Sequence, residues 1–317
     1  MGACLVAFGF VLISVVAKLL EVWLRRSYIA NITKDKYVFI TGCDTGFGNG
    51  LARQLDTKGV KVIATCLTEQ GCTNLRDATS ERTTILQMDV TNHESVLSAF
   101  TEVKKIIPHQ AALWGVVNNA GIANLTGYVE WSKLDDYRKV LSVNLLGAID
   151  VTLTFLPLLK TSRGRLVNVT SCAGRLASMT GGYCESKFAL EAFSDVVRRQ
   201  VRTLGYGIQV SIIEPGFFAT NVGSREVATK SVTSCWQRLT KEEQLEFPEE
   251  MLNTYLNTKL AGIASLLSTD IQKVTDSMEH ALFAKWPRTR YVAGWDAKFA
   301  WIPMSLLPTR LADILVP

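Results

Sequence analysis

The chain has 317 residues, enough to bury one large hydrophobic core or two small ones. Hydrophobic residues make up 48% and charged residues 20%, which excludes an intrinsically disordered chain. The net charge of +5 is small and spread along the sequence, so we expect no nucleic-acid partner. The seven cysteines lack the spacing of metal ligands, so we expect reduced thiols and no metal site.

The first predicted element is an N-terminal membrane anchor. Residues 3–17 carry no charge and the apolar character continues to Leu24, which is just long enough to span a bilayer. The positive charges of Arg25 and Arg26 follow the apolar run instead of preceding it. This order favours a retained anchor over residues 1–26, with an interfacial helix or a cleaved signal peptide as the alternatives.

The orientation of the chain across the membrane has two interpretations. Positive charge just after the anchor favours a cytosolic position for the rest of the chain. Three N-x-[ST] sequons, at Asn31, Asn124 and Asn168, leave a lumenal position open. The Asn168 sequon lies within a predicted core strand, where a glycan has no room.

Beyond residue 36, strand-like apolar runs alternate with helical patterns. Six runs predict strands, at residues 37–41, 60–65, 85–89, 113–118, 165–170 and 208–213. Helices are predicted at residues 49–58, 94–107, 137–159 and 183–204. Nearly continuous apolar strands separated by helices indicate a parallel sheet covered on both faces. The sequence therefore predicts a single doubly wound (Rossmann) α/β domain over residues 36–317.

A glycine-rich turn follows the first predicted strand and leads into a helix. Its sequence is Thr41-Gly42-Cys43-Asp44-Thr45-Gly46-Phe47-Gly48. Glycines allow a tight turn and a close approach of the backbone to a pyrophosphate, which a helix N-terminus stabilises. The order of strand, turn and helix predicts a dinucleotide site.

The choice between NAD and NADP depends on the end of the second strand. An acidic residue there binds a ribose 2′-hydroxyl, and an arginine accepts a 2′-phosphate. The chain has Thr65, Cys66 and Leu67 at this point, so neither signal is present. The glycine loop contains no Arg or Lys, and Asp44 would repel a phosphate, so NAD is favoured. A turn-capping role explains Asp44 equally well.

Tyr183 and Lys187 form a candidate catalytic pair, because residues spaced i, i+4 share one face of a helix. A free tyrosine has a pKa of about 10. A nearby ammonium and an oxidised nicotinamide favour the phenolate, which can then act as a base. Ser171 ends the fifth predicted strand, at the edge where ligands bind, and can hold a substrate oxygen. Asn144 is a polar residue in an apolar helix, either a satisfied core amide or a member of a proton relay.

These motifs, together and in this order, resemble the short-chain dehydrogenase/reductase family over residues 36–225. Asp89-Val90, Asn118-Asn119-Ala120-Gly121 and Pro215-Gly216 add to the likeness. The resemblance implies that Ser171, Tyr183, Lys187 and Asn144 are catalytic. It also implies a set of cofactor contacts, namely Thr41, Gly42, Asp44, Thr45, Gly46, Phe47, Gly48, Cys66, Asp89, Val90, Asn118, Ala120, Gly121, Tyr183, Lys187, Pro215, Gly216 and Thr220.

Further segments resemble the membrane-bound retinol and hydroxysteroid dehydrogenase branch, at residues 35–44, 191–195, 287–291 and 294–298. Thr45 and Thr170 stand where that branch usually has serine. The resemblance implies an enzyme of the endoplasmic reticulum membrane, with a homodimer as one possible assembly. It would use NAD to oxidise retinol to retinal or, alternatively, a 3α- or 17β-hydroxysteroid. A non-catalytic dinucleotide-binding scaffold is a remote alternative.

The end of the chain is expected to bind the substrate, because the strand–helix alternation stops after Pro215. Residues 221–280 predict lid helices whose apolar side chains either pack on the sheet or line a pocket, namely Trp236, Leu239, Leu245, Phe247, Met251, Tyr255 and Leu256. The tail, residues 295–307, is rich in apolar and aromatic residues. It either rests on the membrane or packs as a buried segment.

Overall fold

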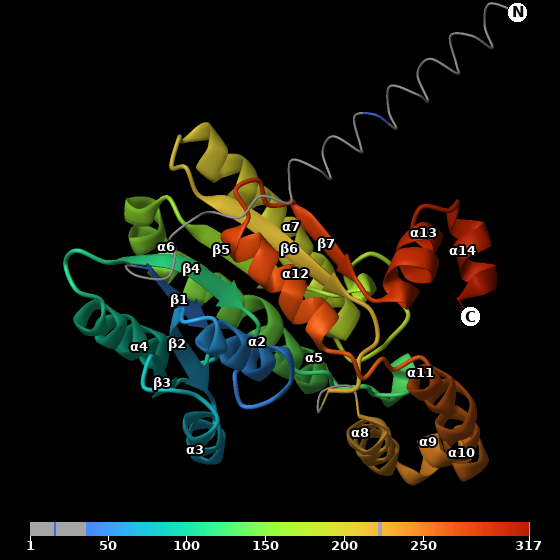
Figure 1. Cartoon of the computed structure of the whole chain (residues 1–317). Coiled ribbons are helices and arrows are strands. Elements are labelled where there is room, and N and C mark those ends of the chain that lie inside the picture. The colour runs from blue at the N-terminus through green and yellow to red at the C-terminus, as the bar shows by residue number, and fades with distance from the viewer. Residues whose placement is uncertain (1–15, 17–35, 221–223, 317) are drawn as a thin grey trace, which may run out of the picture.

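A computed structural model of the chain describes residue 16, residues 36–220 and residues 224–316. Seven strands form one fully parallel sheet in the order β3-β2-β1-β4-β5-β6-β7 (Figure 1). Their bounds are β1 Lys36–Ile40, β2 Lys61–Cys66, β3 Thr83–Gln87, β4 Ala112–Asn118, β5 Arg165–Val169, β6 Gln209–Pro215 and β7 Arg290–Ala293. The predicted doubly wound α/β fold is confirmed. The predicted anchor, residues 1–26, lies outside the described residues apart from residue 16.

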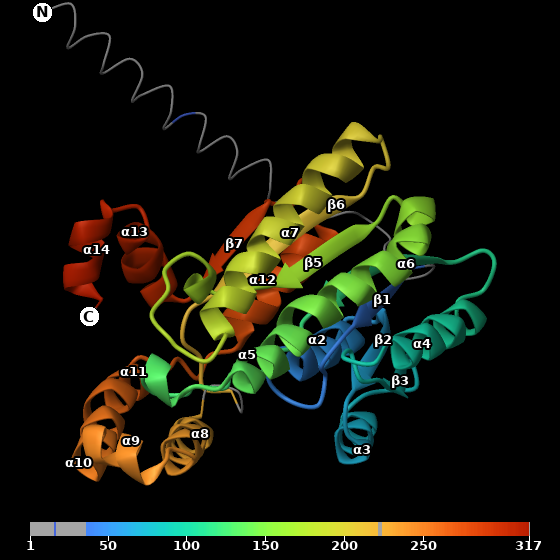
Figure 2. The same cartoon turned by 180° about the vertical axis from the view of Figure 1, so that it is seen from behind.

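Helices cover both faces of the sheet because the side chains of each strand alternate between them. On β1, Val38 and Ile40 join the core on one face and Tyr37 and Phe39 the core on the other. The first face is covered by α2 Gly46–Thr57, α3 Glu69–Asp77 and α12 Gln272–Phe283. The second is covered by α4 His93–Ile106, α6 Ala148–Ser162 and α7 Tyr183–Thr203 (Figure 2).

The seventh strand corrects the expectation that the alternation stops after Pro215. After the lid helices the chain forms α12 and then β7, which pairs in parallel with β6. Only four residues make up β7, and an apolar run as short as Tyr-Val-Ala does not identify a strand in the sequence. Helix α3 was also not predicted, because its nine residues are largely polar.

The longest helical stretch contains a π-helical segment. It runs through α5 Leu134–Leu141, η2 Ser142–Gly147 and α6, where a single helix over residues 137–159 was predicted. By length and composition, Leu134–Ser162 is the one stretch of the described residues that could cross a membrane. Val151, Phe155 and Leu159 are nevertheless buried against the sheet, so we treat it as a core helix.

Two C-terminal groups of helices stand on the same side of the body in both views (Figures 1 and 2). The first, called the lid below, comprises α8 Arg225–Gln237, α9 Lys241–Glu246, α10 Glu249–Tyr255, η5 Leu256–Leu260 and α11 Ala261–Ser265. The second, called the tail, comprises η6 Ala297–Trp301, α13 Ile302–Met304 and α14 Thr309–Leu315. Short 3₁₀ turns lie at η1 Val129–Trp131 and η3 Cys172–Gly174.

Candidate active site

A cavity of about 510 Å³ lies at the carboxyl ends of the strands, beside the switch between β1 and β4. Ligands of open parallel sheets bind at this position. The turns after β1 to β6 form its strand-end wall, and the lid forms the opposite wall. Most of the predicted site residues line it, namely Gly42, Asp44, Thr45, Gly46, Phe47, Asp89, Val90, Ala120, Gly121, Ser171, Tyr183, Lys187, Pro215, Gly216 and Thr220.

The glycine turn is shaped for close approach of a ligand to the backbone. Gly42 has a φ of +67°, and a Cβ there would lie 2.6 Å from the Cα of Ala120. Thr41 lies behind the turn, where its hydroxyl accepts from the backbone N–H groups of Asn119 and Ala120. The Asn119 side chain donates to the carbonyls of Thr41 and Gly42 at 2.9 Å. Asn119 therefore holds the turn, a role that we did not predict.

Asp44 caps the loop at the end of β2. Its carboxylate accepts from the backbone N–H groups of Leu67 and Thr68, at 2.8 and 2.9 Å. Asp44 therefore caps the loop after β2, which is 23 and 24 residues away, and not its own turn as an Asx residue would; its negative charge also stands on the cavity wall. Cys66, the strand residue beside this loop, is buried and does not line the cavity.

Ser171 and Tyr183 meet on the strand-end wall. The Ser171 hydroxyl accepts from the Ala173 N–H at 3.1 Å and lies 3.4 Å from the Pro215 carbonyl oxygen, so its position is well determined. Tyr183 is the first residue of α7 and follows Gly182, which has a φ of +87°. Burial raises the pKa of the Tyr183 phenol, and a hydrogen bond with Ser171 opposes that rise.

Lys187 lies one helical turn after Tyr183, buried on the same wall. Its Nζ donates to the Val169 carbonyl oxygen at 3.0 Å and lies 5.6 Å from the centre of the Tyr183 ring. Burial lowers the pKa of Lys187 to about 8, and the Glu191 carboxylate opposes this shift. The ammonium is thus held beside the phenol, where its charge favours the phenolate.

Asn144 lies in the π-helical segment and not in the cavity wall. Its Oδ1 accepts from the Ile122 N–H at 2.8 Å, and its Nδ2 donates to the Ile122 carbonyl and to the Ser186 hydroxyl. A Cβ at Gly121 would lie 3.4 Å from Asn144 Oδ1 and 3.5 Å from Lys187 Nζ. The amide is therefore a satisfied buried group next to Lys187, and a part in a proton relay stays a prediction.

Two further predicted cofactor residues, Gly48 and Asn118, also stand behind the cavity wall. A Cβ at Gly48 would lie 2.5 Å from the Gly42 carbonyl oxygen, so the glycine permits the turn to pack on its helix. The Asn118 amide donates to the core groups Thr152 and Asn168. Asn168 itself is fully buried, as expected for the sequon without room for a glycan.

The lid wall is apolar, but residues other than those singled out in the sequence line it. Those seven residues lie outside the cavity lining. Trp236, Leu239, Phe247, Tyr255 and Leu256 pack around Trp131, in a cluster that reaches the cavity through Ala228 and Leu260. The lining is instead formed by Ala228, Leu260, Ile263, Ala264 and Leu267, opposite Leu125, Val143 and Met179. Arg225 is the one charged lining residue from the described part of the lid.

The tail is largely exposed and touches the cavity at one point. Phe299, Leu306 and Ile314 are 78%, 73% and 74% exposed. Phe217, which lines the cavity, packs against the Trp301 ring at 5.3 Å between centres. Buried Asp296 accepts from the Phe217 N–H at 2.7 Å and thereby holds the loop after β6. In the sequence, only the motif at residues 294–298 points to a role for Asp296.

Comparisons with known proteins agree with this geometry. Residues 36–231 match the model of the short chain dehydrogenase family. Rattus norvegicus retinol dehydrogenase 7 is 47% identical over 94% of this chain and 92% of its own. Homo sapiens 17-beta-hydroxysteroid dehydrogenase type 6 is 45% identical over 93% and 92%. A Burkholderia phymatum short chain dehydrogenase/reductase in complex with NAD superposes with a TM-score of 0.64 at 20% identity, over 89% and 96% of the two chains.

Proposed function

Since the chain belongs to the short-chain dehydrogenase family and is an oxidoreductase acting on CH–OH groups, we propose that it oxidises a lipophilic alcohol with NAD, retinol to retinal being the first candidate. The observation that carries the proposal is the meeting of Ser171, Tyr183 and Lys187 on one wall of a cavity whose opposite wall is apolar.

The residues of the strand-end wall fit a nicotinamide dinucleotide. The turn at Gly42 and Gly46 leaves room for a pyrophosphate at the N-terminus of α2, since side chains there would fill the approach. Asp44 places a negative charge at the end of β2 and no arginine from there lines the cavity, which favours NAD over NADP. Bound NAD supplies the hydride acceptor and, near Tyr183, a positive charge.

The proton is handled by the chain's own residues. Ser171 holds the alcohol oxygen, and Tyr183 as phenolate takes the hydroxyl proton. Lys187 stabilises the phenolate by its charge, which counteracts the burial that raises the pKa of Tyr183. Asn144 keeps the Ile122 peptide in place beside Lys187, and the relay of the proton to solvent passes along this side.

The apolar lid wall favours a substrate whose far end is hydrocarbon, as in retinol. Hydroxysteroids are the second candidate, and one observation favours them. A 3α- or 17β-hydroxysteroid carries a second oxygen at its far end, and Arg225 offers that oxygen a hydrogen-bond donor from the lid. Loss of steroid turnover with unchanged retinol turnover in Arg225→Ala would identify this role.

The decisive experiment is a panel of retinols and 3α- and 17β-hydroxysteroids, each with NAD and with NADP, compared by kcat/KM. We expect retinol with NAD to rank first. Tyr183→Phe should lower kcat at least about 1,000-fold while NAD still binds, because only the proton acceptor is lost. Retained turnover in that variant would overturn the proposed chemistry.

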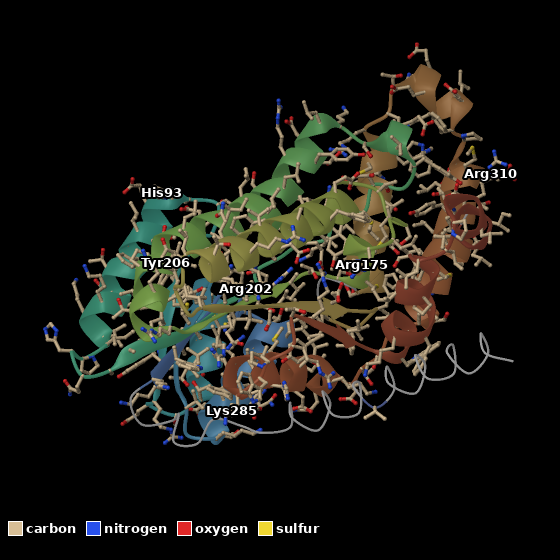
Figure 3. All side chains as sticks on the ribbon, turned by 90° about the horizontal axis from the view of Figure 1, so that it is seen from above. His93, Arg175, Arg202, Tyr206, Lys285 and Arg310 are labelled. Carbon is tan, nitrogen blue, oxygen red and sulfur yellow. The ribbon has the colours of Figure 1, made fainter. Side chains whose placement is uncertain are left out.

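We also place the enzyme on the membrane of the endoplasmic reticulum, with its catalytic domain on the cytosolic side. Apolar Phe299, Leu306 and Ile314 of the tail are exposed close to cationic Arg310, a combination suited to the membrane interface. Figure 3 shows Arg310 at one end of the molecule. The contact between Phe217 and Trp301 joins this surface to the cavity, so a lipophilic alcohol could enter directly from the bilayer.

A homodimer is the assembly we propose. The outer face of α6 and α7 exposes large apolar side chains, including Leu153, Phe188 and Val196. Burying such a patch against a second copy gives the helix-on-helix contact typical of symmetric dimers. Light scattering of the purified protein in detergent measures the assembly directly.

A further inference from the structure

A cluster of buried charges lies directly behind the catalytic wall. Glu191 on α7 and Glu214 on β6 are 6% and 1% exposed. The Arg290 guanidinium contacts both carboxylates and also donates to Asp195 at 3.0 Å. Arg175, labelled in Figure 3, donates to Glu214 at 2.9 Å. Two carboxylates that share one arginine inside a protein are costly to bury, so their position calls for an explanation.

Glu191 joins this cluster to the strand end that carries Ser171. Its Oε1 lies 2.5 Å from the hydroxyl of Thr170, the residue before Ser171. The same hydroxyl lies 2.9 Å from the Ile213 carbonyl oxygen. A threonine has one hydrogen for these two acceptors, and Thr170 donates it to the nearer one, the Glu191 carboxylate. Glu191 thus fixes the end of β5 against β6.

Glu191 also stands one helical turn from Lys187 and two turns from Tyr183. The Lys187 ammonium donates to the Val169 carbonyl oxygen. Lys187 and Glu191 therefore contact the same end of β5 from one face of α7. Burial lowers the pKa of Lys187, and Glu191 is the group that opposes this shift. On α7, Tyr183 lies one turn further from Glu191 than Lys187 does.

The charges that face Glu191 come from every element packed around it. Arg290 contributes from β7, Glu214 from β6, Thr170 from the end of β5, and Lys187 and Asp195 from α7 itself. Burial and Glu214 raise the pKa of Glu191, whereas Thr170 and Arg290 lower it.

We propose that Glu191 is a positioning residue for the reaction: its carboxylate holds the Thr170–Ser171 strand end and keeps the proton of the Lys187–Tyr183 pair on Lys187. The inference rests on the proposed function, because it assigns Tyr183 as the base. It adds a group outside the catalytic set that decides which member of the pair is charged.

The test is the pH dependence of kcat/KM for Glu191→Gln in the full-length enzyme. Without the negative charge, the Lys187–Tyr183 pair loses its first proton more easily. The acid limb of the pH profile, where kcat/KM rises with pH, should therefore move to lower pH by about one pH unit. That proton then leaves Lys187 instead of Tyr183, because Lys187 is the nearer of the two. The active form becomes scarcer, and the plateau should fall about tenfold.

Two further variants separate this role from simple structural support. Glu191→Asp keeps the charge and should restore the position of the limb. Asp195→Asn removes a carboxylate from the same arginine, one turn further from Lys187, and should leave the limb unchanged. A lower plateau in Glu191→Gln without a shifted limb, or an equal shift in Asp195→Asn, would overturn the proposal. A wild type that does not oxidise the alcohols with NAD, or a Tyr183→Phe variant that does, would instead overturn the proposed function.

Discussion

Polar contacts between neighbouring turns hold the strand-end wall of the cavity, whereas the lid combines apolar packing with polar contacts to the body, such as Arg238 with Asp136. Thr41, Asn119 and Asp44 each bond backbone groups of neighbouring turns. In the lid, Val232 and Tyr255 pack against Trp131 of η1 and Leu125 of the body. The first wall therefore has a single geometry suited to an invariant cofactor, and the second can vary with the substrate.

The largest effect on this comparison should come from Gly42→Ala in the strand-end wall. The new Cβ would lie 2.6 Å from the Ala120 Cα at a residue with a φ of +67°. We expect an NAD KM at least about tenfold higher and a loss of stability of about 3 kcal/mol, from strain and overpacking together. Steady-state kinetics and thermal unfolding measure the two effects.

The matched control is Gly59→Ala. Gly59 also has a positive φ, +77°, but an added Cβ would meet nothing within 4 Å. This variant should cost about 1 kcal/mol from backbone strain alone and leave the NAD KM unchanged. Equal effects of the two substitutions on the NAD KM would contradict the idea of a closely fitted turn.

The same contrast explains what the sequence could predict. The glycines and candidate catalytic groups of the strand-end wall lie at short spacings next to apolar strands, so Gly42, Ser171, Tyr183 and Lys187 were all predicted as site residues, and all line the cavity. The lid offered only helical periodicity, which cannot tell a side chain that faces the cavity from one that faces a second cluster. The aromatic residues pack with one another around Trp131, whereas the smaller Ala228, a member of the same cluster, and Ala264 line the cavity.

Contacts between distant segments were equally hidden. Glu191 and Arg290 are 99 residues apart in the chain, and Phe217 and Asp296 are 79 apart. Arg290 begins β7 and Asp296 follows it, and the four residues of this strand are too few for a pattern in the sequence to identify it. A short strand whose position is determined by its neighbours leaves its partners unpredictable from local sequence.

The second-largest effect should come from the ion pair that connects the lid to the body. Arg238 of the lid donates to Asp136 of α5 at 2.7 Å. Burial alone would raise the pKa of Asp136, but the bonds from Arg238 and the Lys133 N–H outweigh it, so the pKa is lowered. The stability that this carboxylate contributes is complete above its unfolded pKa of about 4 and is lost as the pH falls below that value.

Asp136→Asn should therefore lower the free energy of unfolding by about 1–2 kcal/mol at pH 7, with Arg238 partly exposed and its contribution reduced accordingly. The difference from wild type should shrink towards pH 3. Asp135→Asn, which removes an exposed carboxylate paired with Arg138, is the control and should change little. If the difference in the free energy of unfolding did not change with pH, the shape of the Asp136 side chain, and not its charge, would hold the lid to the body.

The smallest effect should come from Gly262→Ala on the lid, and it should have the opposite sign. Gly262 lies in α11, outside the left-handed region, with nothing within 4 Å of an added Cβ. Alanine there reduces the freedom of the unfolded chain, so we expect about 0.5–1 kcal/mol of added stability with unchanged kcat/KM. Gly205→Ala, in equally open space but at a φ of +66°, should destabilise instead. Gly262→Ala could instead lower kcat/KM for a large alcohol but not for a small one. That result would mean that the lid has to open for substrate entry. The looser packing of the lid would then serve turnover as well as substrate range.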